Sequence, residues 1–85
     1  MDLTDLLGSI GANLHALRVN RGLTQARLAE LAGLDVRFLQ RIERGRTNLG
    51  VAVLVALAGA LAVAPARLLR AAKLPPVQRG RPRGA

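Results

Sequence analysis

Closely spaced helix-start and helix-end signals within residues 23–45 constrain this chain more than any other feature of its sequence. Thr24 can cap a helix, because its hydroxyl can accept a hydrogen bond from an otherwise unpaired amide of the first turn. Gly33 suits the left-handed conformation that ends many helices, and Asp35 can cap a helix that follows at once. The stretch therefore predicts two short helices joined by a tight turn, at residues 25–32 and 36–44, with Gly45 ending the second.

The residues of these two helices divide into an inner and an outer face. We expect the following side chains to point inward: Leu28, Ala29, Leu31, Ala32, Leu39 and Ile42. On the outer face of 36–44, Arg37 and Arg41 lie four residues apart and Arg44 follows three later, so the three share one side. A charged helix face is usually only solvated, but a second helix and a tight turn beside it favour a DNA-reading unit. In the major groove, arginine can pair with guanine and glutamine with adenine.

The segments before and after this unit predict further helices. Five apolar residues recur at three- and four-residue steps in 3–21: Leu6, Leu7, Ile10, Leu14 and Leu17. Gly8 and Gly11 weaken the start of this helix, so we expect it to become firm at Ser9, acting as an N-cap, and to end at Gly22.

Residues 49–66 carry no charge, and two interpretations are open. A membrane span would need such a stretch as one continuous helix. Pro65 favours instead two helices, at 50–61 and 65–72, because proline suits the first turn of a new helix. The apolar surplus of residues 51–63 then predicts a surface for a protein partner.

Composition predicts one small all-α domain with a polyanionic partner. The chain has 85 residues, a single aromatic residue and no cysteine, which favours packed short helices over a β-sandwich. Thirteen lysines and arginines against five acidic residues give a net charge of +8, which suits nucleic acid or an anionic membrane. The alternative is that the many arginines reflect a biased base composition of the coding DNA and not a binding function. We divide the chain into a domain, 1–72, and a basic tail, 73–85, expected to be disordered.

Several short motifs at fixed spacing carry a family resemblance: Leu23-Thr24-Gln25, Leu28-Ala29, Gly33-Leu34 and Arg41-Ile42-Glu43-Arg44-Gly45. Over about 60 residues the chain resembles the helix-turn-helix domains of the Cro and phage-repressor (XRE-type) family. The resemblance implies a compact five-helix, lambda-repressor-like bundle whose third helix enters the major groove. It implies base contacts from Val36, Arg37, Gln40 and Arg41, and phosphate contacts from Gln25, Arg44, Arg46 and Asn48.

The resemblance also bears on Glu43, an acid that would repel phosphate if it faced DNA. It implies a partly buried ion pair with Arg18 of the first helix, which would orient the recognition helix; two independent surface charges are the alternative. Phe38 is expected to pack at the helix edge, with contact to a thymine methyl as the other option. Gly50 stands where the family often has serine, and glycine is the weaker cap.

The tail contains a run similar to the core of an AT-hook, with Arg79, Arg81 and Arg83 as the residues that would enter the minor groove. Unspecific phosphate binding and no binding role are the alternatives. Gln78 replaces the proline that usually precedes the core of this motif.

These observations predict a sequence-specific transcriptional regulator, a repressor by preference, that binds double-stranded DNA as a homodimer through its C-terminal apolar helices. The alternative is a protein-interaction module, such as an antitoxin-like adaptor, that uses 51–63. We expect no enzyme, because paired carboxylates, a phosphate-binding glycine loop and a Ser/His/Asp set are absent and the lone His15 has no neighbouring metal ligand. We also expect no cofactor, small-molecule ligand or membrane partner. The acidic start, Asp2 and Asp5, is unlike a signal peptide, so a cytoplasmic, nucleoid-associated location is expected.

Overall fold

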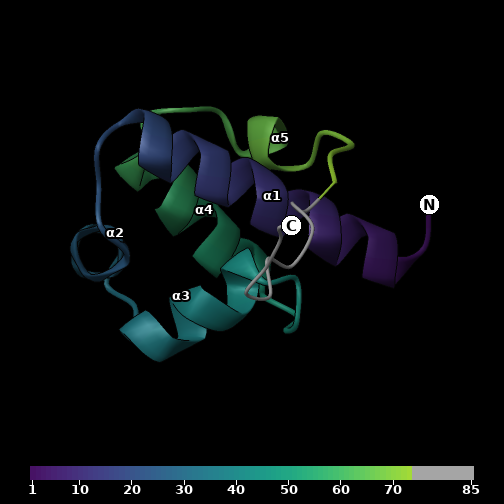
Figure 1. Cartoon of the computed structure of the whole chain (residues 1–85), viewed down its shortest axis with the longest axis horizontal. Helices are drawn as coiled ribbons and strands as arrows, with labels where there is room; N and C mark the ends of the chain where they lie inside the picture. Colours follow the sequence, from purple (N-terminus) through teal and green to yellow (C-terminus); the bar gives the residue numbers. More distant parts are fainter. Residues whose placement is uncertain (74–85) are drawn as a thin grey trace, which may run out of the picture.

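Five helices, with no strand between them, form the part of the chain that the computed structural model describes, residues 1–73 (Figure 1). Their bounds are α1 Leu3–Asn20, α2 Gln25–Ala32, α3 Val36–Glu43, α4 Val51–Ala60 and α5 Pro65–Leu68. The all-α, five-helix prediction is confirmed. Arg79, Arg81 and Arg83 lie outside the described residues, so the predictions for the tail remain predictions.

The first helix begins at Leu3, the start of the predicted range 3–21, and is already firm before Ser9. Asp2 is its N-cap: one side-chain oxygen accepts from the Asp5 amide at 2.8 Å, and the Asp5 carboxylate accepts from the Asp2 amide at 3.5 Å. This capping box satisfies two amides of the first turn and offsets the low helix propensity of Gly8 and Gly11. The assignment of Ser9 as an N-cap was therefore wrong, and Ser9 is instead a buried residue inside the helix.

The caps of the central two helices follow the sequence. Thr24 Oγ1 accepts from the Arg27 amide at 3.0 Å, and Asp35 Oδ1 accepts from the Arg37 amide at 2.7 Å. Gly33 has a φ of 72°, a left-handed conformation that costs glycine little, and so the chain reverses between α2 and α3. In Figure 1, α2 is seen end-on while α3 lies across the view, so the two helices cross steeply.

The helices meet around one apolar core. α1 packs on α3 and α5, α2 packs on α3 and α4, and α4 packs on α5. The largest fully buried side chains come from all five helices and from the C-cap of α4, Leu61: Leu14, Leu28, Leu39, Ile42, Leu57, Leu61 and Leu68. The inward placement of Leu31 was wrong, since 47% of this residue is exposed. The buried face of α2 is centred between Leu28 and Ala29, and at about 100° per residue Leu31 lies at its edge.

The close approach of α1 to α3 depends on Gly11. A Cβ at this position would lie 2.7 Å from the carbonyl oxygens of both Ile42 and Glu43. Both are backbone atoms that cannot turn away, so only glycine fits without moving one helix. Gly11 therefore sets how the C-terminal end of α3 sits on α1.

The chain after α5 does not continue as the predicted helix to residue 72. It leaves the helix after Leu68 and is tied to α1 by side chains. Asn13 Nδ2 donates to the Leu68 and Arg70 carbonyls at 2.9 and 2.8 Å. Ser9 Oγ donates to the Ala72 carbonyl and accepts from the Ala72 amide, each at 3.1 Å. These bonds satisfy backbone groups that a longer helix would have paired internally.

Residues 49–66 are divided between α4, a turn and the start of α5, as the two-helix interpretation predicted. Among residues 1–73, no helix combines the length and the apolar character that crossing a bilayer requires.

Candidate nucleic-acid interface

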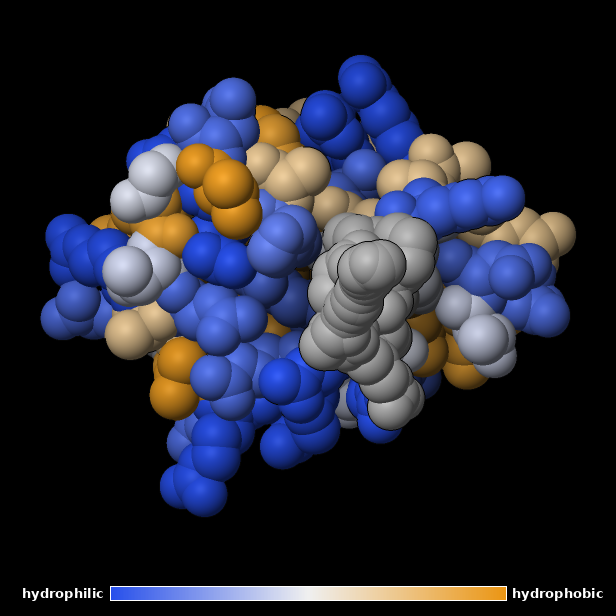
Figure 2. Space-filling model, in the orientation of Figure 1, coloured by the Kyte–Doolittle hydropathy of each residue, from blue (hydrophilic) through white to orange (hydrophobic). Residues whose placement is uncertain are grey.

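The two faces of α3 differ sharply in burial. Leu39 and Ile42 are almost completely buried, whereas Arg37 and Arg41 are exposed, as is Arg44 at the C-cap. The surface over α3, along the lower edge of Figure 2, is mainly hydrophilic. The predicted arginine face is thus presented to solvent by a helix that the core holds on its other side.

The other two residues expected to contact bases are less exposed than the arginines. Val36 and Gln40 are both half-buried, and Val36 packs against the core cluster. The second arginine of the face has an aromatic neighbour: the Arg41 guanidinium lies over the Phe38 ring, 5.7 Å from its centroid. Phe38 itself is half-buried and packs against the core, as expected.

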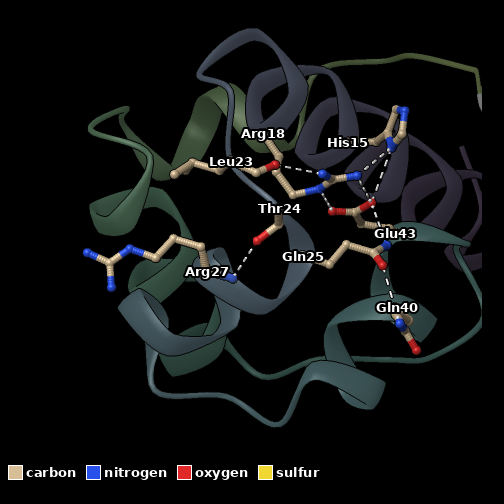
Figure 3. A network of polar contacts seen from close by, with 8 residues as sticks. All are labelled: His15, Arg18, Leu23, Thr24, Gln25, Arg27, Gln40 and Glu43. Carbon is tan, nitrogen blue, oxygen red and sulfur yellow. Dashed lines mark hydrogen bonds and ion pairs between the residues drawn. The ribbon is translucent and has the colours of Figure 1, made fainter.

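Glu43 is the centre of a polar network that joins three helices (Figure 3). Arg18 Nε donates to Glu43 Oε2 at 2.6 Å and Arg18 Nη2 to Oε1 at 3.1 Å, so the expected ion pair is present and bidentate. Only 4% of the Glu43 side chain and 12% of the Arg18 side chain are exposed. Arg18 Nη1 also donates to the Leu23 carbonyl at 2.8 Å, which fixes the start of the turn into α2.

The charge of Glu43 is maintained by these donors. Burial alone would raise the pKa of this carboxyl group. Hydrogen bonds from Arg18, Gln25 and His15, together with the positive charge of Arg18, outweigh that effect and hold the pKa below its ordinary value. Glu43 is therefore an ionised carboxylate at neutral pH, turned inward and away from the outer face.

The network reaches the outer face of α3 through two glutamines. Gln25 Nε2 donates to Glu43 Oε1 at 3.1 Å, and Gln40 Nε2 donates to Gln25 Oε1 at 3.3 Å. A continuous set of hydrogen bonds thus leads from Arg18 on α1 to Gln40 on α3 (Figure 3). The Gln25 carboxamide, expected to contact phosphate, is already engaged at its oxygen and at one amide hydrogen.

His15, whose side chain is 46% exposed on α1, belongs to the same network, which the sequence did not indicate. Its Nδ1 lies 3.2 Å from Glu43 Oε1 and 3.3 Å from Arg18 Nη2. The signal that could have found it is spacing, because His15 precedes Arg18 by three residues and so shares its helix face. A protonated Nδ1 donates to Glu43, and an unprotonated one accepts from Arg18.

The connection between α3 and α4 carries the remaining residues expected to contact phosphate. Arg46 and Asn48 are exposed, as is Arg44 before them. Gly45, with a φ of 69°, turns the chain out of α3, and its amide donates to the Ile42 carbonyl at 3.0 Å. Asn48 Oδ1 accepts from the Leu49 amide at 2.8 Å. This leaves the Asn48 amide group as the donor for a phosphate.

Comparison with known proteins matches this arrangement to a family. The helix-turn-helix model HTH_3 matches residues 14–68, which include α2, α3, the turn between them and the Glu43 network. The chain belongs to the HTH_3 helix-turn-helix family. It is accordingly a DNA-binding transcriptional regulator, as the sequence predicted, and its relatives do not favour the adaptor alternative.

Individual relatives of this helix-turn-helix protein are regulators and not enzymes. A hypothetical transcription factor of Neisseria meningitidis serogroup B is 37% identical over 78 residues, covering 92% of this chain and 70% of the relative. The immunity repressor protein of Bacillus phage phi105 is 44% identical over 55 residues, covering 65% of this chain and 38% of the relative. The restriction-modification controller protein C.AhdI of Aeromonas hydrophila superposes with a TM-score of 0.71 at 39% identity, covering 73% of this chain and 94% of the controller.

Proposed function

We propose that this regulator is a repressor that reads a specific operator by inserting α3 into the major groove of double-stranded DNA, and that it does so as a homodimer. The observation that carries the proposal is the exposed arginine face of a helix whose opposite side is locked into the core. A recognition helix must present unpaired hydrogen-bond donors in a fixed orientation relative to the rest of the domain. The Arg18–Glu43 ion pair and the close contact at Gly11 both hold α3 against α1 and so support such an orientation.

The base-contacting roles follow from the chemistry of each side chain. Arg37 and Arg41 would each pair with guanine through two parallel N–H donors, and Gln40 would contact adenine. Val36, half-buried at the start of α3, would offer an apolar contact to a thymine methyl. Gln40 is oriented for this role by Gln25, to which it donates a hydrogen bond.

Phosphate contacts would fix the register of α3 in the groove without reading sequence. Arg44, Arg46 and Asn48 would supply them on the C-terminal side of α3, where all three are exposed. Gln25 would supply one at the start of α2 with its second amide hydrogen, since the first is bonded to Glu43. A basic tail contact to DNA remains a proposal from sequence alone.

The dimer proposal depends on α4 and the surface next to it. One recognition helix reads only a few base pairs, so specificity requires two half-sites about one helical turn apart. α4 has no charged residue, and Val51 and Val55, four positions apart, are 76% and 51% exposed. Val51 also lines a hollow of about 220 Å³ with the exposed Leu3 and Leu69. We propose that this apolar surface, Leu3, Val51, Val55 and Leu69, packs against its counterpart in a second copy.

The dimer proposal is tested by placing a charge on that surface. Val51→Glu with Val55→Glu should yield a monomer by sedimentation equilibrium, and DNA affinity should fall because each half-site is then bound separately. Ala16→Glu, at an exposed position of α1, is the matched control and should leave the association state unchanged. A double variant that stays dimeric would remove this surface from the interface.

The DNA-reading proposal is tested on the arginines. Arg37→Ala and Arg41→Ala should each weaken operator binding by about 1–3 kcal/mol and relax the preference for one base pair. Arg70→Ala is the control, because Arg70 is also exposed but follows α5, which packs on α1 and α4. If the double arginine variant binds the operator as tightly as the wild type, α3 is not the reading helix.

A further inference from the structure

Phe38 and Arg41 form a pair on the outer side of α3. The two residues are three positions apart on the helix, so their side chains are neighbours. The Arg41 guanidinium carbon is over the ring, 5.7 Å from its centroid, which is within the range of a cation–π contact. Phe38 is half-buried and packs against the core, whereas Arg41 is exposed. An anchored ring thus supports a charged group that solvent can reach.

The kind of support matters for what Arg41 can still do. The arginine–carboxylate pairs found among residues 1–73 use Arg18 and Arg27, and Arg41 has none there. A carboxylate partner would occupy the N–H donors of a guanidinium and neutralise its charge. A phenyl ring attracts the cation through its face but has no lone pair that would accept the guanidinium N–H groups. Arg41 is therefore held in place with its donors available.

Arg37 offers an internal contrast on the same helix. Within the described residues, the Arg37 side chain makes no hydrogen bond or ion pair and its guanidinium has no ring beside it, while the Arg37 backbone amide donates to Asp35. At about 100° per residue, Phe38 and Arg37 point in different directions from α3. Any effect of Phe38 on base reading should therefore act on the base pair read by Arg41 and not on the one read by Arg37.

We propose that Phe38 is a specificity-determining positioning residue, whose ring holds the Arg41 guanidinium ready for one guanine. This inference rests on the proposed base reading by α3 and adds a residue that need not touch DNA. The ring limits the conformations of a long, flexible side chain before binding, so less order is lost when the guanine contact forms. Removing the ring should weaken discrimination at that base pair about two- to fivefold.

The experiment compares Phe38→Leu and Phe38→Met, which remove the ring, with Phe38→Tyr, which keeps it. Each full-length variant is titrated against the operator selected by the wild type and against every single-base-pair change of that operator. Thermal unfolding of each variant shows whether it is folded. Two non-aromatic replacements are used so that the comparison can still be made if one of them fails to fold. Arg41→Ala identifies the base pair that Arg41 reads, and Phe38→Leu combined with Arg41→Ala tests whether the two residues act together.

The expected result is a loss of preference by Phe38→Leu and Phe38→Met at the same base pair that Arg41→Ala affects. Phe38→Tyr should retain the preference, and the double variant should discriminate no worse than Arg41→Ala alone. Three results overturn the inference: an equal loss of affinity for all sites, a loss confined to a thymine position that Arg41→Ala does not affect, or additive losses in the double variant. If Arg41→Ala changes no base preference, the proposed base contact by Arg41 is wrong, and the role inferred for Phe38 is then wrong as well.

Discussion

Gly11→Ala is the substitution whose effect the structure defines most closely. Two opposing contributions act on the free energy of unfolding. Alanine in place of a helical glycine stabilises a helix by about 1 kcal/mol. At position 11, however, the new Cβ would meet two backbone carbonyl oxygens at 2.7 Å, well inside the contact distance of ordinary Cβ atoms. Overpacking of this kind costs about 1–3 kcal/mol, and more when neither neighbour can move.

Gly8→Ala separates the two contributions. Gly8 is in the same helix, and a Cβ there would meet nothing within 4 Å. The gain in helix propensity is common to both variants, so the difference between them measures the steric cost alone. We expect Gly8→Ala to stabilise the protein and Gly11→Ala to be less stable than it by about 2 kcal/mol or more.

Urea denaturation followed by circular dichroism gives the two free energies. For a domain of this size, 1 kcal/mol corresponds to about 4–8 °C in Tm, so thermal melts resolve the difference as well. Gly11→Ala should also bind DNA more weakly at temperatures where it is folded, because α3 must shift on α1. Equal stability of the two variants would refute the claim that Gly11 sets the contact between α1 and α3.

Three further predictions concern buried polar groups. Glu43→Gln should lower the free energy of unfolding by about 3 kcal/mol, because it leaves Arg18 without a buried counter-charge, whereas Glu30→Gln, on an exposed pair, should change it by less than about 1 kcal/mol. Because the pKa of Glu43 is lowered in the folded state, the ionised carboxylate stabilises the fold fully above its ordinary pKa, and this stabilisation is lost as pH falls through the folded-state pKa. When the free energy of unfolding is measured at decreasing pH, it should therefore fall less in Glu43→Gln than in the wild type. An equal fall in both proteins would contradict the assignment of a lowered pKa to Glu43. Asn13→Ala should cost about 1–3 kcal/mol by removing two hydrogen bonds to the chain after α5, whereas the exposed Asn20→Ala should be nearly neutral in the same urea titration.

Local signals in the sequence predicted most of the helix-turn-helix unit. Thr24, Gly33 and Asp35 act on residues one to three positions away, so their roles can be recognised without knowledge of the fold. The Arg18–Glu43 pair joins residues far apart in the chain, and only the family resemblance indicated it. His15 was missed because its partner Glu43 comes from another helix.

The ends of the domain depended on contacts that sequence patterns do not reveal. The helix at Pro65 was expected to reach residue 72, since alanine, leucine and arginine all favour helix there. Side chains of Ser9 and Asn13, more than fifty residues earlier, bond the backbone of 68–72 instead. Gly11 appeared in the sequence only as a weak point of a helix, because the value of a missing Cβ depends on which atoms lie opposite it.

Selection of bound DNA from a random pool tests the central claim most directly. The wild type should enrich two copies of a short half-site with centres about 10 base pairs apart. Each half-site should contain guanines, and the preference for one guanine should be lost in Arg37→Ala and for another in Arg41→Ala. Arg70→Ala should enrich the same motif as the wild type. Enrichment of an unchanged motif by the double arginine variant, or of no motif by the wild type, would contradict sequence reading by α3.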